Sequence, residues 1–110
     1  MCCNGNRCGA LDRAKRFQRY FRALHCPTRW TIIRIIGGKE KSSGEILKEL
    51  KEEGEGLARS SLYYHLSEME KADIIELSRY REVGGGAPEK VWKLKTKEIR
   101  INLLKDLEGP

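Results

Sequence analysis

The chain has 110 residues, 39% of them hydrophobic and 35% charged, and carries a formal net charge of +6. This length suits one domain with a modest core that dimerisation would help to stabilise; the lack of a long apolar run or a secretory signal excludes a membrane-spanning protein and indicates a cytosolic one. Residues 1–36 hold 8 Lys/Arg and one acid. This basic end favours a polyanionic partner such as nucleic acid as much as it favours a solvated helix face.

The first 24 residues are expected to form an arm and then a helix. Residues 1–10 hold three cysteines, two glycines and two asparagines without periodicity, which indicates a flexible arm. Over residues 11–24 an apolar stripe that includes Phe17 and Phe21 recurs at helical spacing, and arginines occupy the other side. The stripe predicts a helix that packs on the core or on a second copy of the chain, while its arginines leave open that it faces DNA.

Two further helices are expected to follow. One should begin at Pro27 and stop at Gly37, and its isoleucines and Trp30 predict that it is the buried centre of the domain. Ser42 and Glu45 have the spacing of a capping box, which predicts the start of the next helix. The residues of that helix expected to point inward are Ile46, Leu47 and Leu50.

The stretch from Leu57 to Ile75 predicts a helix with an unusual polar face. Leu62, Leu66 and Met69 recur at helical spacing and predict a narrow buried stripe. The outer face bears short hydroxyls, tyrosines and basic side chains, whereas a solvated face would usually bear long Glu and Lys side chains. Such a face suits close approach to a DNA major groove. The candidate DNA-binding residues of this helix are Arg59, Ser60, Ser61, Tyr63, Tyr64, Ser67 and Lys71.

After this helix the pattern changes to that of a β-hairpin. Residues 75–81 and 91–94 are predicted strands, and a glycine-rich loop separates them. Thr96 can cap a last helix over residues 98–110, which is expected to serve dimerisation. The basic residues of the hairpin are Arg79, Arg81, Lys90 and Lys93, of which the first three are candidate DNA contacts.

The order of these elements predicts the fold class. Three helices, the last with a polar outer face, followed directly by a basic hairpin, are typical of a winged helix-turn-helix domain. We therefore expect a mainly α, single-domain fold with a small β-hairpin over residues 11–97, homodimeric in its active form.

Three segments resemble a known family. Phe21–Ile36 resembles the first core helix of ArsR-type repressors, and Ser61–Ile75 is similar to the recognition helix of ArsR and PadR regulators. The hairpin segment Gly84–Thr96 is similar to the wing of PadR proteins. Together the matches cover about residues 11–97, and they imply a homodimeric, DNA-binding transcriptional repressor.

The resemblance also implies roles for single residues. It implies that Ser60, Ser61 and Tyr64 meet base edges, that Tyr63 and Lys71 meet the phosphate backbone, and that Arg81 and Lys90 lie in the wing. His65 falls on the flank of the buried stripe, where we expect a packed or hydrogen-bonded histidine. The chain departs from metal-sensing ArsR proteins, because residues 43–50 lack their paired cysteines, and Cys26 stands where an Asp is usual.

The cysteines allow three interpretations. Cys26 lies at the start of a predicted helix beside His25 and Arg29, a position that favours a thiolate, the reactive and metal-binding form. Zinc or an iron–sulfur cluster on the cysteines, a thiol switch such as a Cys8–Cys26 disulfide, and no specific role all stay open. The candidate metal or redox residues are Cys2, Cys3, Cys8 and Cys26.

A second function class is a winged helix that serves as a protein-interaction module of the transcription machinery. The polar recognition face argues against it, because a protein interface would prefer exposed apolar anchors there. An enzyme is not expected: neither His25 nor His65 has a carboxylate partner at catalytic spacing, and the glycine triplet 84–86 lies in a hairpin.

Overall fold

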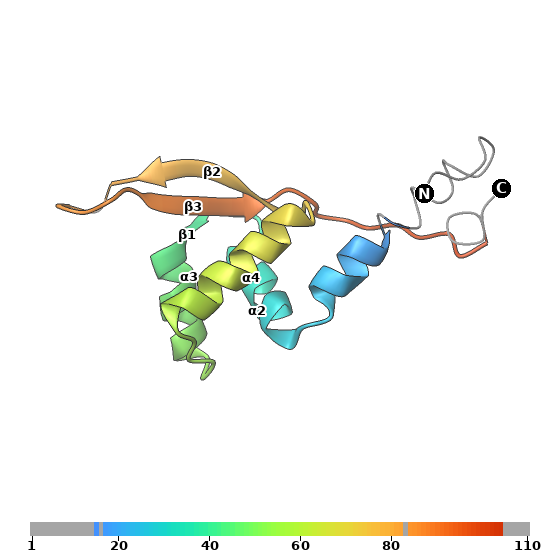
Figure 1. The fold of residues 1–110 in the computed structure, drawn as a ribbon, viewed down its shortest axis with the longest axis horizontal. Coiled ribbons are helices and arrows are strands. Elements are labelled where there is room, and N and C mark those ends of the chain that lie inside the picture. Colours follow the sequence, from blue (N-terminus) through green and yellow to red (C-terminus); the bar gives the residue numbers. More distant parts are fainter. Residues whose placement is uncertain (1–14, 16, 83, 105–110) are drawn as a thin grey trace.

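The computed structural model describes residue 15, residues 17–82 and residues 84–104. A helical segment over residues 17–24 is followed by six elements. They are α2 (Pro27–Ile36), β1 (Lys41–Ser42), α3 (Ser43–Glu52), α4 (Arg59–Lys71), β2 (Ile75–Arg81) and β3 (Glu89–Leu94). The strands form one antiparallel sheet in the order β1-β3-β2, and α2, α3 and α4 lie on one side of it (Figure 1). This arrangement matches the predicted three helices followed by a wing.

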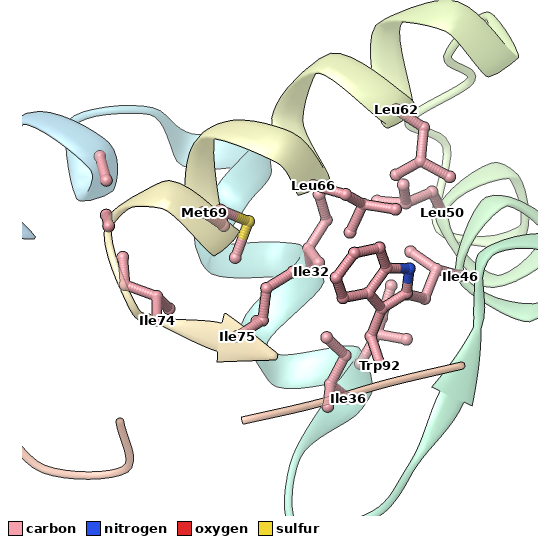
Figure 2. Packing of buried hydrophobic residues seen from close by; sticks show 13 residues of the cluster. Ile32, Ile36, Ile46, Leu50, Leu62, Leu66, Met69, Ile74, Ile75 and Trp92 are labelled. Carbon is pink, nitrogen blue, oxygen red and sulfur yellow. The ribbon is translucent and has the colours of Figure 1, made fainter. Parts of the chain in front are cut away.

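The core lies between the three helices and the sheet. Figure 2 shows the Trp92 ring of β3 among isoleucines and leucines of α2, α3 and α4. This one strand residue therefore packs against all three helices. The predicted stripe of α4 is confirmed, because Leu62, Leu66 and Met69 are buried. The Trp92 Nε1 donates a hydrogen bond to Ser43 Oγ at 3.1 Å, which satisfies its one polar atom.

The predicted capping box at the start of α3 is present. Ser42 Oγ accepts from the backbone N–H of Glu45 at 3.1 Å, and a Glu45 carboxylate oxygen accepts from the Ser42 N–H at 2.9 Å. Ser42 is also the last residue of β1, so the box joins the sheet to the helix within one residue. Two of the orphan N–H groups at the helix start are thereby satisfied.

The end of α4 is attached to the end of the sheet. Asp73 adopts a positive φ of 62°, and this residue turns the chain from the helix into β2. The Thr96 hydroxyl donates to the Asp73 carbonyl at 2.6 Å, and the backbone N–H of Lys95 donates to the Ile74 carbonyl at 2.9 Å. The C-terminal end of α4 is thus held by residues that follow β3.

The structure corrects three expectations. The strand β1 was not expected, since two residues show no period of their own. Trp30 is 54% exposed and donates to the Leu24 carbonyl at 2.7 Å, so the buried side of α2 consists of isoleucines and Arg29. The last helix does not form over residues 96–104. Thr96 donates to the Asp73 carbonyl and caps no helix, and Leu103 and Leu104 are exposed, so no packed apolar side supports a helix there. Residues 105–110 and the expected arm over residues 1–10 lie outside the described residues.

None of the described helices is long and apolar enough to cross a membrane.

The capping box makes stability depend on pH. The backbone N–H of Ser42, supported by the Ser42 hydroxyl and Arg81, lowers the pKa of Glu45 below its usual value. The stabilisation by the ionised carboxylate is therefore present above the unfolded-state pKa and is lost as pH falls through the folded-state pKa. Glu45→Gln should lower the free energy of unfolding at pH 7 by about 0.3–1 kcal/mol, and the difference from wild type should shrink in acid.

Urea unfolding at pH 7 and near pH 3 measures this difference. Glu52→Gln, an exposed carboxylate at the other end of α3, is the matched control and should lose no stability at pH 7. A Glu45→Gln deficit that is equally large at both pH values would contradict the role of the charge.

Candidate nucleic-acid interface

The outer arc of α4 is an exposed polar helix face. It consists of Ser60, Ser61, Tyr64, Ser67 and Lys71. All except the half-buried Ser67 are exposed, and the Tyr64 side chain is 60% exposed. Hydroxyl groups on short side chains and on a projecting tyrosine can donate or accept hydrogen bonds at base edges. The structure therefore brings five of the predicted site residues onto one continuous surface.

The start of α4 leaves backbone donors available. Its N-cap is Ala58, which makes no side-chain hydrogen bond to the first turn, and the first turn contains no acidic residue. Uncapped N–H groups at a helix start carry partial positive charge and suit an anion such as a phosphate group. Arg59 lies at the same end, and its Nη1 donates to the Tyr63 hydroxyl at 3.3 Å. That contact joins two candidate backbone-contacting residues.

A buried arginine of α2 supports the outer arc from behind. Arg29 is only 8% exposed, and its Nη1 donates to the Ala23 carbonyl at 3.0 Å. Its Nε donates to His65 Nδ1 at 3.1 Å, and its guanidinium carbon lies 5.9 Å from the centre of the Tyr64 ring. Arg29 therefore touches two consecutive residues of α4, of which one projects from the outer arc.

The contact with Arg29 defines the state of His65. An arginine is always protonated, so its Nε must donate, and His65 Nδ1 must accept. Burial, and to a lesser extent the positive charge of Arg29, lower the pKa of His65, which keeps the imidazole neutral at pH 7. The prediction that His65 is hydrogen-bonded is confirmed. Sequence reasoning missed the role of Arg29, since its partner lies 36 residues away.

A groove separates α4 from the wing. Its volume is about 390 Å³, and it is lined on one side by Tyr63, Ser67 and Glu70 and on the other by Glu89, Lys90 and Trp92. The Lys90 ammonium lies 5.7 Å from the centre of the Trp92 ring. The groove lies between the outer arc and the wing, so these two regions form separate surfaces that a ligand could contact.

The basic residues of the wing differ in how free they are. The Arg81 guanidinium donates to Ser42 Oγ at 3.0 Å and lies 3.4 Å from a Glu45 and 3.5 Å from a Glu89 carboxylate oxygen. Arg79 Nε lies 3.8 Å from Glu40, whereas Lys90 pairs with no carboxylate in the described part of the chain. Sequence reasoning treated the wing cations alike, because the carboxylates come from other elements.

The cysteine predictions fall largely outside the described residues. Cys2, Cys3 and Cys8 lie outside them, and Cys26 is a half-buried free thiol at the N-cap of α2. Within residues 15, 17–82 and 84–104, no three His, Cys, Asp or Glu side chains gather into a group that could hold a metal ion.

Comparison with known proteins places this geometry in a family. A model of a helix-turn-helix domain family matches residues 23–78, which is more than half of the chain and runs from the end of the first helical segment into β2. No curated protein matches the chain.

Three solved structures are similar to the chain. Rv0081 of M. tuberculosis has a TM-score of 0.56 and 22% identity, covering 74% of this chain and 72% of its own. Reduced HlyU from Vibrio cholerae has a TM-score of 0.60 and 17% identity, covering 81% of this chain and 82% of its own. The Vibrio cholerae ferric uptake regulator has a TM-score of 0.51 and 21% identity, covering 73% of this chain and 64% of its own.

These identities are low, so the structures support the fold, and the family match carries the assignment. The resemblance to winged-helix regulators of the ArsR/PadR type is thereby confirmed. The chain belongs to the helix-turn-helix domain family and is a DNA-binding transcriptional regulator with a winged-helix fold.

Proposed function

We propose that two copies of the chain bind one sequence-specific site on duplex DNA and repress transcription from it. The observation that carries this proposal is the outer arc of α4, which is exposed, polar and supported from behind by Arg29. A helix of 13 residues with such a face fits a major groove, which admits an α-helix. Repression itself rests on the family resemblance and needs a reporter assay.

Within the site the residues divide by what they can reach. Ser60, Ser61 and Tyr64 read base edges, because they project from the first two turns of α4 on its outer arc. The backbone phosphates are contacted by Arg59, Tyr63, Ser67 and Lys71 from α4 and by Arg79 and Lys90 from the wing. The Arg81 guanidinium already donates to Ser42 and pairs with Glu45 and Glu89. Its main role is therefore to fix the hairpin rather than to contact DNA.

Exposed apolar side chains away from α4 support the homodimer. Phe21 is 45% exposed and stacks on Phe17 with 6.4 Å between ring centres, and Trp30 and Leu104 are exposed as well. Aromatic side chains left in water on a small domain favour an interface. A second copy of the chain that covers these side chains would bring a second α4, and two such helices suit half-sites one helical turn apart.

The same exposed apolar side chains favour the second candidate function, in which a different protein covers them. Sedimentation at micromolar concentration separates the two: a dimer supports the proposal. A monomer that binds no duplex and is recovered with a stoichiometric protein partner supports the interaction module.

Tyr64→Ala should reduce sequence preference. Once a site has been selected from a random duplex library with the wild-type protein, the variant should lose about 1–3 kcal/mol of discrimination against single-base changes. Lys90→Ala should instead weaken binding to all sequences alike and reduce the salt dependence by about one phosphate contact. Fluorescence anisotropy over a salt series measures both, with Lys39→Ala as the control. Uniform weakening by Tyr64→Ala would contradict a base contact.

Phe21→Ala should weaken the dimer. Loss of an interface aromatic costs about 2 kcal/mol or more, so the dimer dissociation constant should rise at least roughly 30-fold. Sedimentation velocity over a dilution series gives this constant. Tyr80→Ala, which removes another exposed aromatic side chain from β2, is the matched control and should leave the constant unchanged. Equal constants for wild type and Phe21→Ala would exclude this face.

Control of DNA binding through the cysteines is a hypothesis that oxidant and zinc test directly. If zinc, an iron–sulfur cluster or a disulfide acts through them, oxidant or zinc should change the affinity of the wild type for its selected site. A variant with serine at Cys2, Cys3, Cys8 and Cys26 should not respond, and Cys26→Ser alone shows whether the thiol at the start of α2 is needed. An affinity of the wild type that is the same in every condition would rule out this control.

A further inference from the structure

A small cleft lies beside the C-terminal half of α4, on the side opposite the wing groove. Its volume is about 170 Å³. The residues that line it come from the helical segment 17–24, from α2 and from α4, and they are Arg19, Arg22, Ala23, Arg29, Glu68, Lys71 and Ala72. Four of these side chains are cationic and one is a carboxylate, so the cleft is strongly positive.

The cations of the cleft are only partly neutralised within the chain. Arg19 and Arg22 are exposed and pair with no carboxylate among the described residues. The single acid, Glu68, lies 3.4 Å from the Lys71 ammonium, and an exposed pair at this distance is weak. Arg29 forms the rigid wall, because its hydrogen bonds to Ala23 and His65 fix it. Exposed, unpaired arginines around a concave surface favour an anion.

We propose that this cleft holds one phosphate group of the DNA backbone next to the bases contacted by α4. This inference rests on the proposed function, since it needs α4 to lie in the major groove. Lys71 belongs to both surfaces, and Arg29 touches Tyr64 on one side and lines the cleft on the other. A strand that passes the outer arc would therefore meet Arg19 and Arg22 just beyond it. Arginine forks match the oxygens of a phosphodiester in pairs.

The same placement assigns two faces to the first helical segment. Arg19 and Arg22 are three residues apart and share one side of the helix. Phe17 and Phe21 are four apart and lie on another side, where their rings stack. The basic side can thus contact DNA while the aromatic side contacts a second chain. The same helical segment can therefore bind DNA and a second chain at the same time.

The test is the salt dependence of DNA affinity. The double variant Arg19→Gln/Arg22→Gln should weaken binding to the selected site and to an unrelated duplex by the same factor. The slope of log K against log salt should become shallower by about 0.9 for the phosphate contact that is lost. Glu68→Gln should have the opposite sign and strengthen binding to both duplexes, because it removes the competing carboxylate. A purely structural role of the cleft predicts no gain from Glu68→Gln.

The matched control is Lys39→Gln/Lys97→Gln. It removes the same charge from another cleft, of about 250 Å³, which α4 does not line. Its slope should stay that of the wild type. If both double variants change the slope equally, general charge explains the effect and the proposal is overturned. If Arg19→Gln/Arg22→Gln alters the oligomeric state in sedimentation, Glu68→Gln decides, because Glu68 lies on α4 and has no other assigned contact with DNA.

Two further outcomes separate this proposal from its foundation. A wild-type protein that binds no duplex refutes the proposed function itself. A wild type that binds duplex with a slope that neither Arg19→Gln/Arg22→Gln nor Glu68→Gln changes refutes only the phosphate contact.

Inorganic phosphate titrated into the protein alone, followed by NMR, distinguishes the source of the anion. Saturable binding in the cleft with no change in DNA slope would assign it to a free phosphate and overturn the DNA contact.

Discussion

The hydrogen bonds of the buried Arg29 guanidinium are the interaction on which the placement of α4 depends. A charge inside a small domain is costly unless hydrogen bonds compensate it, and two donors of this guanidinium bind acceptors on two different elements. One bond reaches the carbonyl of Ala23 in the helical segment 17–24, and another reaches His65 in α4. The helical segment 17–24, α2 and α4 are therefore held together at one point, although α4 lies 36 residues along the chain from Arg29. Tyr64 lies against the same guanidinium, so the position of a projecting side chain depends on a buried one.

The wing is held by a comparable arrangement at the other side of α4. Glu89 at the start of β3 accepts a short hydrogen bond of 2.5 Å from the N–H of Gly44 and pairs with Arg81 across the hairpin. A side chain at position 44 would collide with that carboxylate, because an added Cβ would lie 2.4 Å from its oxygen. The base of the hairpin is thus tied to the start of α3 by side chains, in addition to the two residue pairs between β1 and β3. The angle between wing and helices follows from these contacts.

Much of the fold could be predicted from the sequence because its signals are local. Pro27 opens a helix by its own backbone chemistry, Ser42 and Glu45 cap one across three residues, and Leu62 and Leu66 mark a buried side by their spacing. Each of these expectations is confirmed.

The features that could not be predicted depend on partners far along the chain. Arg29 is buried because His65 and a backbone carbonyl accept from it, and nothing near Arg29 in the sequence signals this. Arg81 looks like a free cation until Glu89 and Glu45 are brought to it. Trp30 has the apolar character of a core residue, yet it lies at the surface beside Leu24. The roles of the outer-arc residues remain predictions, since the composition of a face indicates a ligand class and leaves the contacts open.

The two ends of α4 differ in how firmly they are held. Its C-terminal end is fixed by the turn at Asp73 and by the bonds from Thr96 and Lys95, whereas its first turn starts at Ala58 without a side-chain cap. Local opening requires least free energy where backbone hydrogen bonds lack such support. The first turn, with Ser60 and Ser61, can therefore change its conformation while the far end keeps its angle to the sheet. Recognition would then combine an adaptable reading end with a fixed register, and the entropy lost on binding would be concentrated in a single helical turn.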